Sequence, residues 1–217
     1  MTAKTIIKDL AEAGLEANEI FTKANQKLCE NNESGMFVTA WMGILDVNTG
    51  ILKYANAGHN PPLVLKNNGK FEYLKARAGF ILGGMEDIKY RINQMQMEKG
   101  DRIFLYTDGV TEATDENQKL YGEERLQIFM NDNIEVSPQL LLPKVKENID
   151  EFVGDAPQFD DITMLMFEYR KEKSVSRTFV AEDNELSNVL QMIEEEIEKY
   201  KCPFNITNGI CVAIEEV

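Results

Sequence analysis

The sequence has 217 residues and a formal net charge of −14, which excludes nucleic-acid binding and adhesion to anionic membranes as its main role. Its content of 43% hydrophobic and 28% charged residues is typical of a globular protein with a sizeable core. Three widely spaced cysteines, no signal-peptide core and no run of about 20 apolar residues indicate a cytoplasmic protein with reduced thiols that makes no membrane contact.

The N-terminal half predicts two helices followed by a series of hairpins. Apolar residues recur at helical spacing in residues 1–13 and again in residues 16–31. Extended segments follow, separated by turns rich in Asn, Gly and Pro, and they cover residues 36–46, 51–57, 63–66, 70–74 and 90–97. We expect these segments to pair as antiparallel strands.

The second half predicts one more strand pair with helices between its members. Residues 102–106 are an apolar strand, and the polar residues 111–117 that come after it are predicted to be a surface loop. Two helices are expected next, at 123–130 and at 138–153, the second with Ser137 as its N-cap. A last strand of this part spans residues 159–169.

The organisation predicted from these patterns is a domain at 1–170, a linker at 171–177 and a strand-helix-helix fragment at 178–217. The first helix has no start signal, and the helix that begins near Ile206 has no stop signal. We interpret both ends as cuts through secondary structure, so the chain is expected to be part of a longer protein.

Carboxylates stand at the ends of two of the predicted strands. Asp108 directly follows the strand 102–106, and Gly109 beside it permits a sharp turn or a close approach by another group. Asp160 and Asp161 lead into the strand 159–169. If the two strands pair antiparallel, these carboxylates meet at one edge of a sheet and offer the hard oxygen ligands that Mg²⁺ and Mn²⁺ prefer.

The only histidine is His59, in the segment Gly58-His-Asn-Pro-Pro62, which is neither a helix nor a central strand. A Ser-His or Cys-His catalytic pair would therefore have to use His59. Two interpretations remain open for this residue: it holds its own loop by hydrogen bonds, or it contacts a substrate.

Five motifs in this order resemble one known family. They are FVTA at 37–40, YANAGHNPP at 54–62, GDRIFLYTDGVTEA at 100–113, YGEERL at 121–126 and FDDIT at 159–163. Together they resemble the bacterial metal-dependent Ser/Thr protein phosphatases of type 2C, in the SpoIIE-like (RsbU-like) subgroup. The resemblance covers residues 1–170.

This resemblance implies an α+β fold, a four-layer αββα sandwich of two antiparallel sheets flanked by helices. It implies two Mn²⁺ or Mg²⁺ ions that activate a water for attack on phosphoserine or phosphothreonine. The carboxylates of the family's motifs correspond to Asp108 and Asp160, which are thus the expected catalytic and metal-binding residues. Asp161 is a further metal-ligand candidate, and His59 and Gly109 are candidates for substrate contact or loop shaping.

The sequence also departs from the family. The family's Gly-Asp-x-x-Asp strand and Asp-Val-Ser-Gly-His-Gly loop, which supply metal ligands and sheet strands, precede its first helix, and neither motif occurs here. The sandwich is therefore expected to be incomplete. We predict that the chain as given binds metal weakly and has little or no phosphatase activity.

The tail from Arg177 to Val217 resembles the beginning of the histidine-kinase-like ATPase domain of anti-sigma-factor kinases. Glu216 corresponds there to the acidic residue of the ATP site, whereas the glycine-rich nucleotide loops do not occur. The alternative is a helical tail packed on the sandwich.

The function implied by the resemblance is removal of phosphate from an anti-sigma-factor antagonist in a partner-switching pathway. One alternative is a non-catalytic binding or assembly module, because incomplete sheets leave unpaired edges through which homodimers form. Another is part of an ATP-binding anti-sigma-factor serine kinase.

Overall fold

The computed structural model describes residues 3–30, 32–33, 35–66, 69–157 and 160–170. All of them lie in the first of the two units into which the chain divides, Met1–Lys171. The predicted linker, the predicted C-terminal fragment and Glu216 lie outside the described residues. In the part that is described, no helix has the length and apolar character needed to cross a membrane.

The described part begins with two helices, continues with six strands and ends with three helices and a last strand. The helices are α1 (Ala3–Glu12), α2 (Ala17–Cys29), α3 (Asp108–Thr111), α4 (Gly122–Asp132) and α5 (Pro138–Val153). The strands are β1 (Ala40–Leu45), β2 (Ile51–Ala57), β3 (Leu63–Leu65), β4 (Phe71–Tyr73), β5 (Asn93–Gln96), β6 (Arg102–Tyr106) and β7 (Met164–Glu168).

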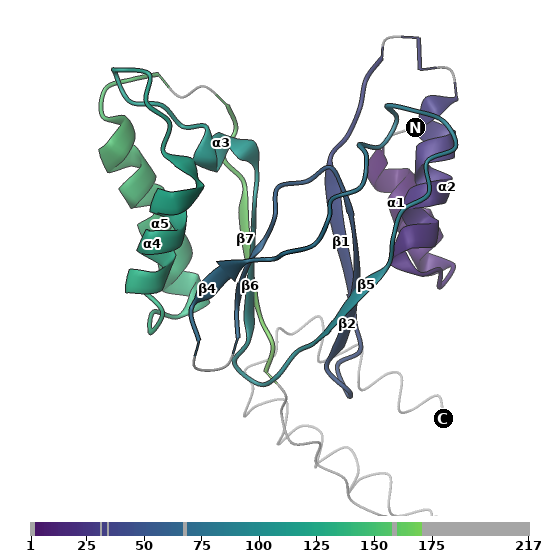
Figure 1. The fold of residues 1–217 in the computed structure, drawn as a ribbon, viewed down its shortest axis with the longest axis horizontal. Helices are drawn as coiled ribbons and strands as arrows, with labels where there is room; N and C mark the ends of the chain where they lie inside the picture. The colour runs from purple at the N-terminus through teal and green to yellow at the C-terminus, as the bar shows by residue number, and fades with distance from the viewer. Residues whose placement is uncertain (1–2, 31, 34, 67–68, 158–159, 171–217) are drawn as a thin grey trace, which may run out of the picture. The chain divides into compact units, whose positions relative to one another are not determined.

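These elements form two antiparallel sheets with helices outside them, as Figure 1 shows. One sheet has the strand order β1-β2-β5, and α1 and α2 cover its outer face. The other has the order β4-β3-β6-β7, and α4 and α5 cover its outer face. The α+β sandwich expected from the sequence is confirmed.

Strand β6 shows how the sequence produces these layers. Side chains alternate between the two faces of a strand, so Phe104 and Tyr106 point toward α4 and α5 while Ile103 and Leu105 point toward the other sheet. Phe104 and Tyr106 are almost fully buried, and their rings stack with centroids 5.6 Å apart. Burying one such side chain stabilises the fold by roughly 1.5–3 kcal/mol.

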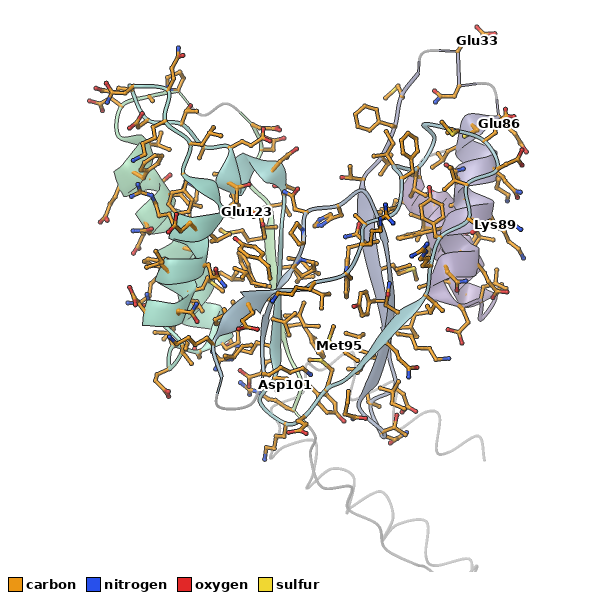
Figure 2. All side chains as sticks on the ribbon, in the orientation of Figure 1. Glu33, Glu86, Lys89, Met95, Asp101 and Glu123 are labelled. Atoms are coloured by element: carbon orange, nitrogen blue, oxygen red, sulfur yellow. The ribbon has the colours of Figure 1, made fainter. Side chains whose placement is uncertain are left out.

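The two sheets pack on each other through a third apolar cluster. Leu52 of β2 contributes to it from one sheet, and Val64 of β3 and Ile103 of β6 contribute from the other. Met95 of β5 packs against this cluster, and Figure 2 shows it between the sheets. Because side chains from both sheets share one core, the ends of their strands are held in a fixed relation.

Arg102 connects β6 by hydrogen bonds to β7 and to the loop between α4 and α5. Nε of Arg102 donates to Oε2 of Glu168 on β7 at 2.9 Å, and Nη1 donates to the carbonyl oxygens of Ile134 and Val136 at 2.9 and 2.8 Å. Both charged side chains are only 14% exposed. The guanidinium thus joins the β6-β7 pair to the loop between α4 and α5.

Several elements differ from the sequence-based expectations. Strand β1 begins at Ala40 instead of residue 36, because Met36 and Phe37 are exposed and only Val38 makes a bridge, to Leu82. Strand β5 is shorter than expected because its pairing with β2 ends at Asn93 and Tyr54, and beyond that point the N–H of Gly79 bonds to the Asn56 carbonyl of β2 instead. Strand β7 begins at Met164 instead of residue 159. A helical turn at α3 is a further difference, which concerns the site and is described below.

Candidate metal centre

The predicted pairing of the two acidic segments is found in the structure. Strands β6 and β7 pair antiparallel, and the last pair of their ladder is Tyr106 with Met164. The chain beyond Tyr106 begins with Thr107 and Asp108, and the chain before Met164 contains Asp160 and Asp161. Both acidic segments therefore lie at the same edge of the sheet.

A threonine extends the connection beyond the ladder. The backbone N–H of Thr107 donates to the carbonyl oxygen of Thr163 at 3.0 Å. Its hydroxyl donates to the carbonyl oxygen of Asp161 at 2.9 Å and accepts from the N–H of Thr163 at 3.0 Å. One side chain thus satisfies two backbone groups of the opposite segment, and this fixes the spacing of the acidic segments.

Gly109 allows the closest approach at this edge. A Cβ atom placed on it would lie 2.6 Å from the carbonyl oxygen of Asp161 and 3.3 Å from that of Asp160. Of the two roles expected for this glycine, close approach is the one observed. The sharp turn is instead a helical turn, because α3 starts at Asp108, and the N–H of Glu112 donates to the Asp108 carbonyl at 2.8 Å.

The carboxylates themselves are on the surface of this edge. Asp108, Asp160 and Asp161 are all exposed. Oδ1 of Asp108 accepts from the N–H of Gly109 at 3.0 Å, and Oδ1 of Asp160 accepts from the N–H of Asp161 at 2.7 Å. These bonds orient each carboxylate against its own backbone.

The donor set fits a small hard cation. Mg²⁺ keeps several waters and is commonly held by one or two carboxylates, and Mn²⁺ prefers similar oxygen ligands. Asp108 and the Asp160–Asp161 pair would supply such carboxylates. Among the residues that the structure describes, there is no group of three or more His, Cys, Asp or Glu side chains arranged to hold a metal. The assignment of individual ligands stays a prediction.

His59 is held by its own loop. Its Nδ1 lies 2.9 Å from the carbonyl oxygen of Asn60. The side chain of Asn56 makes two hydrogen bonds to the backbone of His59: it accepts from the His59 N–H at 2.8 Å and donates to the His59 carbonyl at 2.9 Å. Of the two interpretations left open, this geometry supports loop shaping, and substrate contact stays a prediction.

Sequence reasoning missed the role of Thr107. Its position within the motif Thr107-Asp-Gly109 was visible, but a threonine after a strand is common in turns, and nothing in the sequence indicates which carbonyl its hydroxyl reaches. Only the register of β6 against β7 shows that it bridges to the second acidic segment.

Comparison with known proteins identifies a family and several relatives of the chain. The family model "Stage II sporulation protein E (SpoIIE)" matches residues 1–170. Protein IcfG of Synechocystis sp. is 32% identical over 136 residues, which are 63% of this chain and 21% of that protein. Phosphoserine phosphatase RsbU of Bacillus subtilis is 26% identical over 163 residues, which are 75% of this chain and 48% of that protein.

A solved structure has the same fold. The RsbU and RsbW domains of Rv1364c from Mycobacterium tuberculosis superpose with a TM-score of 0.68 at 20% identity, covering 99% of this chain and 59% of that one. The chain thus spans about a fifth of IcfG and about half of RsbU. Since the family model matches most of its length, the chain belongs to the SpoIIE family.

Proposed function

We propose that the chain is the phosphatase portion of a metal-dependent Ser/Thr protein phosphatase. The observation that carries the proposal is the contact between the backbone of Gly109 and the carbonyl groups of Asp160 and Asp161. It keeps carboxylates from two distant parts of the sequence at one sheet edge, as a site for a divalent cation requires. Membership in the SpoIIE family and the similarity to a phosphoserine phosphatase support the same activity.

In this proposal Asp108, Asp160 and Asp161 would hold Mn²⁺ or Mg²⁺ by their carboxylate oxygens. When bound, such an ion would lower the pKa of water and so supply a nucleophile for the hydrolysis of phosphoserine or phosphothreonine. Thr107 and Gly109 act as positioning residues, because they set the distance between the acidic segments. The two hydrogen bonds from the Asn56 side chain to the His59 backbone keep the His59 loop in one conformation.

The substrate proposed for the whole protein is a phosphorylated anti-sigma-factor antagonist, and the setting is a cytoplasmic partner-switching pathway. The named relative RsbU is a phosphoserine phosphatase, and a solved neighbour joins RsbU and RsbW domains. The predicted beginning of an ATPase domain at 178–217, with Glu216 as its acidic residue, is part of this proposal. Calorimetric titration with ATP and Mg²⁺ tests it, and the expected result for the chain alone is weak binding.

The experiment that tests the activity compares the 217-residue chain with the complete product of its gene. Hydrolysis of para-nitrophenyl phosphate is measured with Mn²⁺, with Mg²⁺ and after chelation. We expect the complete product to be active, the chain to show little turnover, and Asp108→Asn to lower the activity at least about a hundredfold, since even residues that only orient metal ligands cost 10–100-fold.

A matched control distinguishes the loss of a site carboxylate from the loss of any surface carboxylate. Asp155 is an exposed aspartate near Asp160 in the sequence, and Asp155→Asn should leave turnover unchanged. Equal activity of the Asp108→Asn and Asp155→Asn proteins would overturn the proposed site. Robust turnover by the 217-residue chain alone would overturn the prediction that this chain has little phosphatase activity.

A second candidate function is assembly through sheet edges. Within the described residues, β1 pairs only with β2, and β7 pairs only with β6. Leu165 and Phe167 on β7 are apolar but 58% and 38% exposed. Exposed edges of this kind pair with other chains, so we propose that the chain forms homodimers through them. Light scattering tests this proposal.

A further inference from the structure

A pocket beside β5 differs in charge from the rest of this acidic chain. It has a volume of about 150 Å³, and its lining includes Arg77, Lys89, Arg91 and Asn93. Arg77 lies on the segment between β4 and β5, and Lys89 and Arg91 lie on the approach to β5, where Figure 2 labels Lys89. Three cations around one small cavity are unexpected on a chain with net charge −14.

None of these three side chains forms an ion pair within the described part of the chain. The ion pairs found there involve other cations, and Arg77, Lys89 and Arg91 form none of them. All three side chains are exposed. Cations gathered without acidic partners attract an anion, and guanidinium groups bind carboxylate and phosphate oxygens through paired N–H donors.

The walls of the pocket are fixed by the fold. The N–H of Gly79 donates to the carbonyl oxygen of Asn56 at 2.9 Å, and Asn93 pairs with Tyr54 of β2. Tyr90 is 5% exposed and its hydroxyl donates to the Ile81 carbonyl at 3.2 Å. Tyr90 is buried, whereas Lys89 and Arg91 on either side of it are exposed and line the pocket.

The pocket lies at the same end of the two sheets as the acidic edge. Asn56 is at the end of β2, and residues 58–62 lead from there to Leu63 at the start of β3. Leu63 pairs with Phe104, two residues before the end of β6, where Asp108 follows. In Figure 1 the ends of β2 and β6 point the same way.

We propose that Arg77, Lys89 and Arg91 form an anion subsite that holds a carboxylate or phosphate group of the phosphoprotein substrate. The pocket has room for such a group, since its volume equals that of about five water molecules in the liquid. Asn93 lines the same cavity and adds an amide donor. This inference rests on the proposed phosphatase function for the identity of the ligand, but not for the existence of the site.

The first experiment uses inorganic phosphate as the probe and needs no catalysis. The isotope-labelled chain is titrated with sodium phosphate at constant ionic strength, and backbone amide shifts are followed. We expect saturable shifts at residues 77–79 and 89–93. The double variant Arg77→Gln/Arg91→Gln should bind phosphate at least about tenfold more weakly, the change that corresponds to the loss of one strong contact.

A charge-matched control is the double variant Lys99→Gln/Lys119→Gln, which removes two exposed cations that do not line the pocket. It should bind phosphate as the unmodified chain does. The proposal is overturned if phosphate causes no saturable shifts in this region, or if the two double variants bind it equally well. Melting temperatures of both variants show whether each is folded.

The second experiment measures kinetics with the complete gene product and a phosphoprotein substrate. We expect Arg77→Gln/Arg91→Gln to raise KM for the phosphoprotein about tenfold and to keep kcat. An unchanged KM for para-nitrophenyl phosphate then identifies a carboxylate beside the phosphoserine, and a raised one identifies the phosphate itself. An unchanged KM for the phosphoprotein overturns the subsite. Absence of turnover in every protein refutes the phosphatase function alone, because the phosphate titration still decides whether the pocket binds anions.

Discussion

Substitution of Gly109 by alanine tests whether close backbone approach holds the two acidic segments together. The added Cβ would lie 2.6 Å from the carbonyl oxygen of Asp161, whereas ordinary contacts begin at 3.4 Å. The segments would have to separate by about 0.8 Å, and both contacting groups are backbone, so no side chain can move aside to make room.

The size of the effect follows from two opposing contributions. Overpacking of this kind costs roughly 1–3 kcal/mol, and replacing glycine by alanine in a helix recovers up to about 1 kcal/mol. We therefore expect Gly109→Ala to lower the free energy of unfolding by about 1–2 kcal/mol. For a folded unit of this size that corresponds to a decrease in Tm of roughly 2–8 °C.

The assay combines thermal unfolding with hydrogen exchange. In Gly109→Ala the amides of Thr107 and Thr163, which bond across the two segments, should exchange faster than in the unmodified chain. Gly14→Ala is the control. Gly14 has a φ of +75° and no atom lies within 4 Å of the position of an added Cβ, so this substitution introduces backbone strain of about 1–2 kcal/mol but no steric contact. Unchanged Tm and exchange in Gly109→Ala would refute the reasoning.

Three further predictions concern the strands that carry the site. Arg102→Met removes one of the two arginine partners of Glu168 and leaves two carbonyl groups without their donor. It should lower the free energy of unfolding in urea by about 3 kcal/mol. Lys146→Met, which breaks an exposed pair, should lower it by about 0.5 kcal/mol or less. Burial raises the pKa of Glu168, but its bonds and charges with Arg170 and Arg102 outweigh burial and hold that pKa below its ordinary value of 4.5. The resulting stabilisation is present above pH 4.5 and is lost as the pH falls through the lowered pKa. Urea titrations of Glu168→Gln at different pH values should therefore show a smaller loss of stability in acid than those of the unmodified chain. An identical dependence on pH in the two proteins would contradict this. Leu165→Lys should shift light scattering toward the monomer, whereas Leu140→Lys, at a leucine of similar exposure on α5, should not.

The fold was largely predictable because its elements carry regular patterns. The stripe of Ile20, Phe21 and Ala24 on α2 is buried as its helical spacing predicts, and β6 spans the predicted residues 102–106. The ends of β1 and β5 were not predictable. Apolar and aromatic residues such as Phe37 have high strand propensity, yet pairing requires a neighbouring strand, and that depends on tertiary structure.

The candidate site was predictable to a similar degree. The proximity of Asp108 to Asp160 and Asp161 followed from two strand-end carboxylates and an assumed antiparallel pairing, which the structure has. The contact of Gly109 with a carbonyl and the bridging hydroxyl of Thr107 depend on register and on distances below 3 Å, which residue types do not encode. The cationic pocket was missed because its cations come from two segments that each look like ordinary surface.

The hydroxyl of Thr107 has a consequence for motion at the acidic edge. Since it both donates to and accepts from the opposite segment, the β6-β7 connection continues past the last ladder pair. Fluctuations that change the spacing of the acidic segments must therefore break sheet hydrogen bonds, which makes them rare, cooperative openings instead of rapid loop motion. A ligand bound there would encounter a spacing set in advance and would spend little of its binding free energy on ordering the backbone.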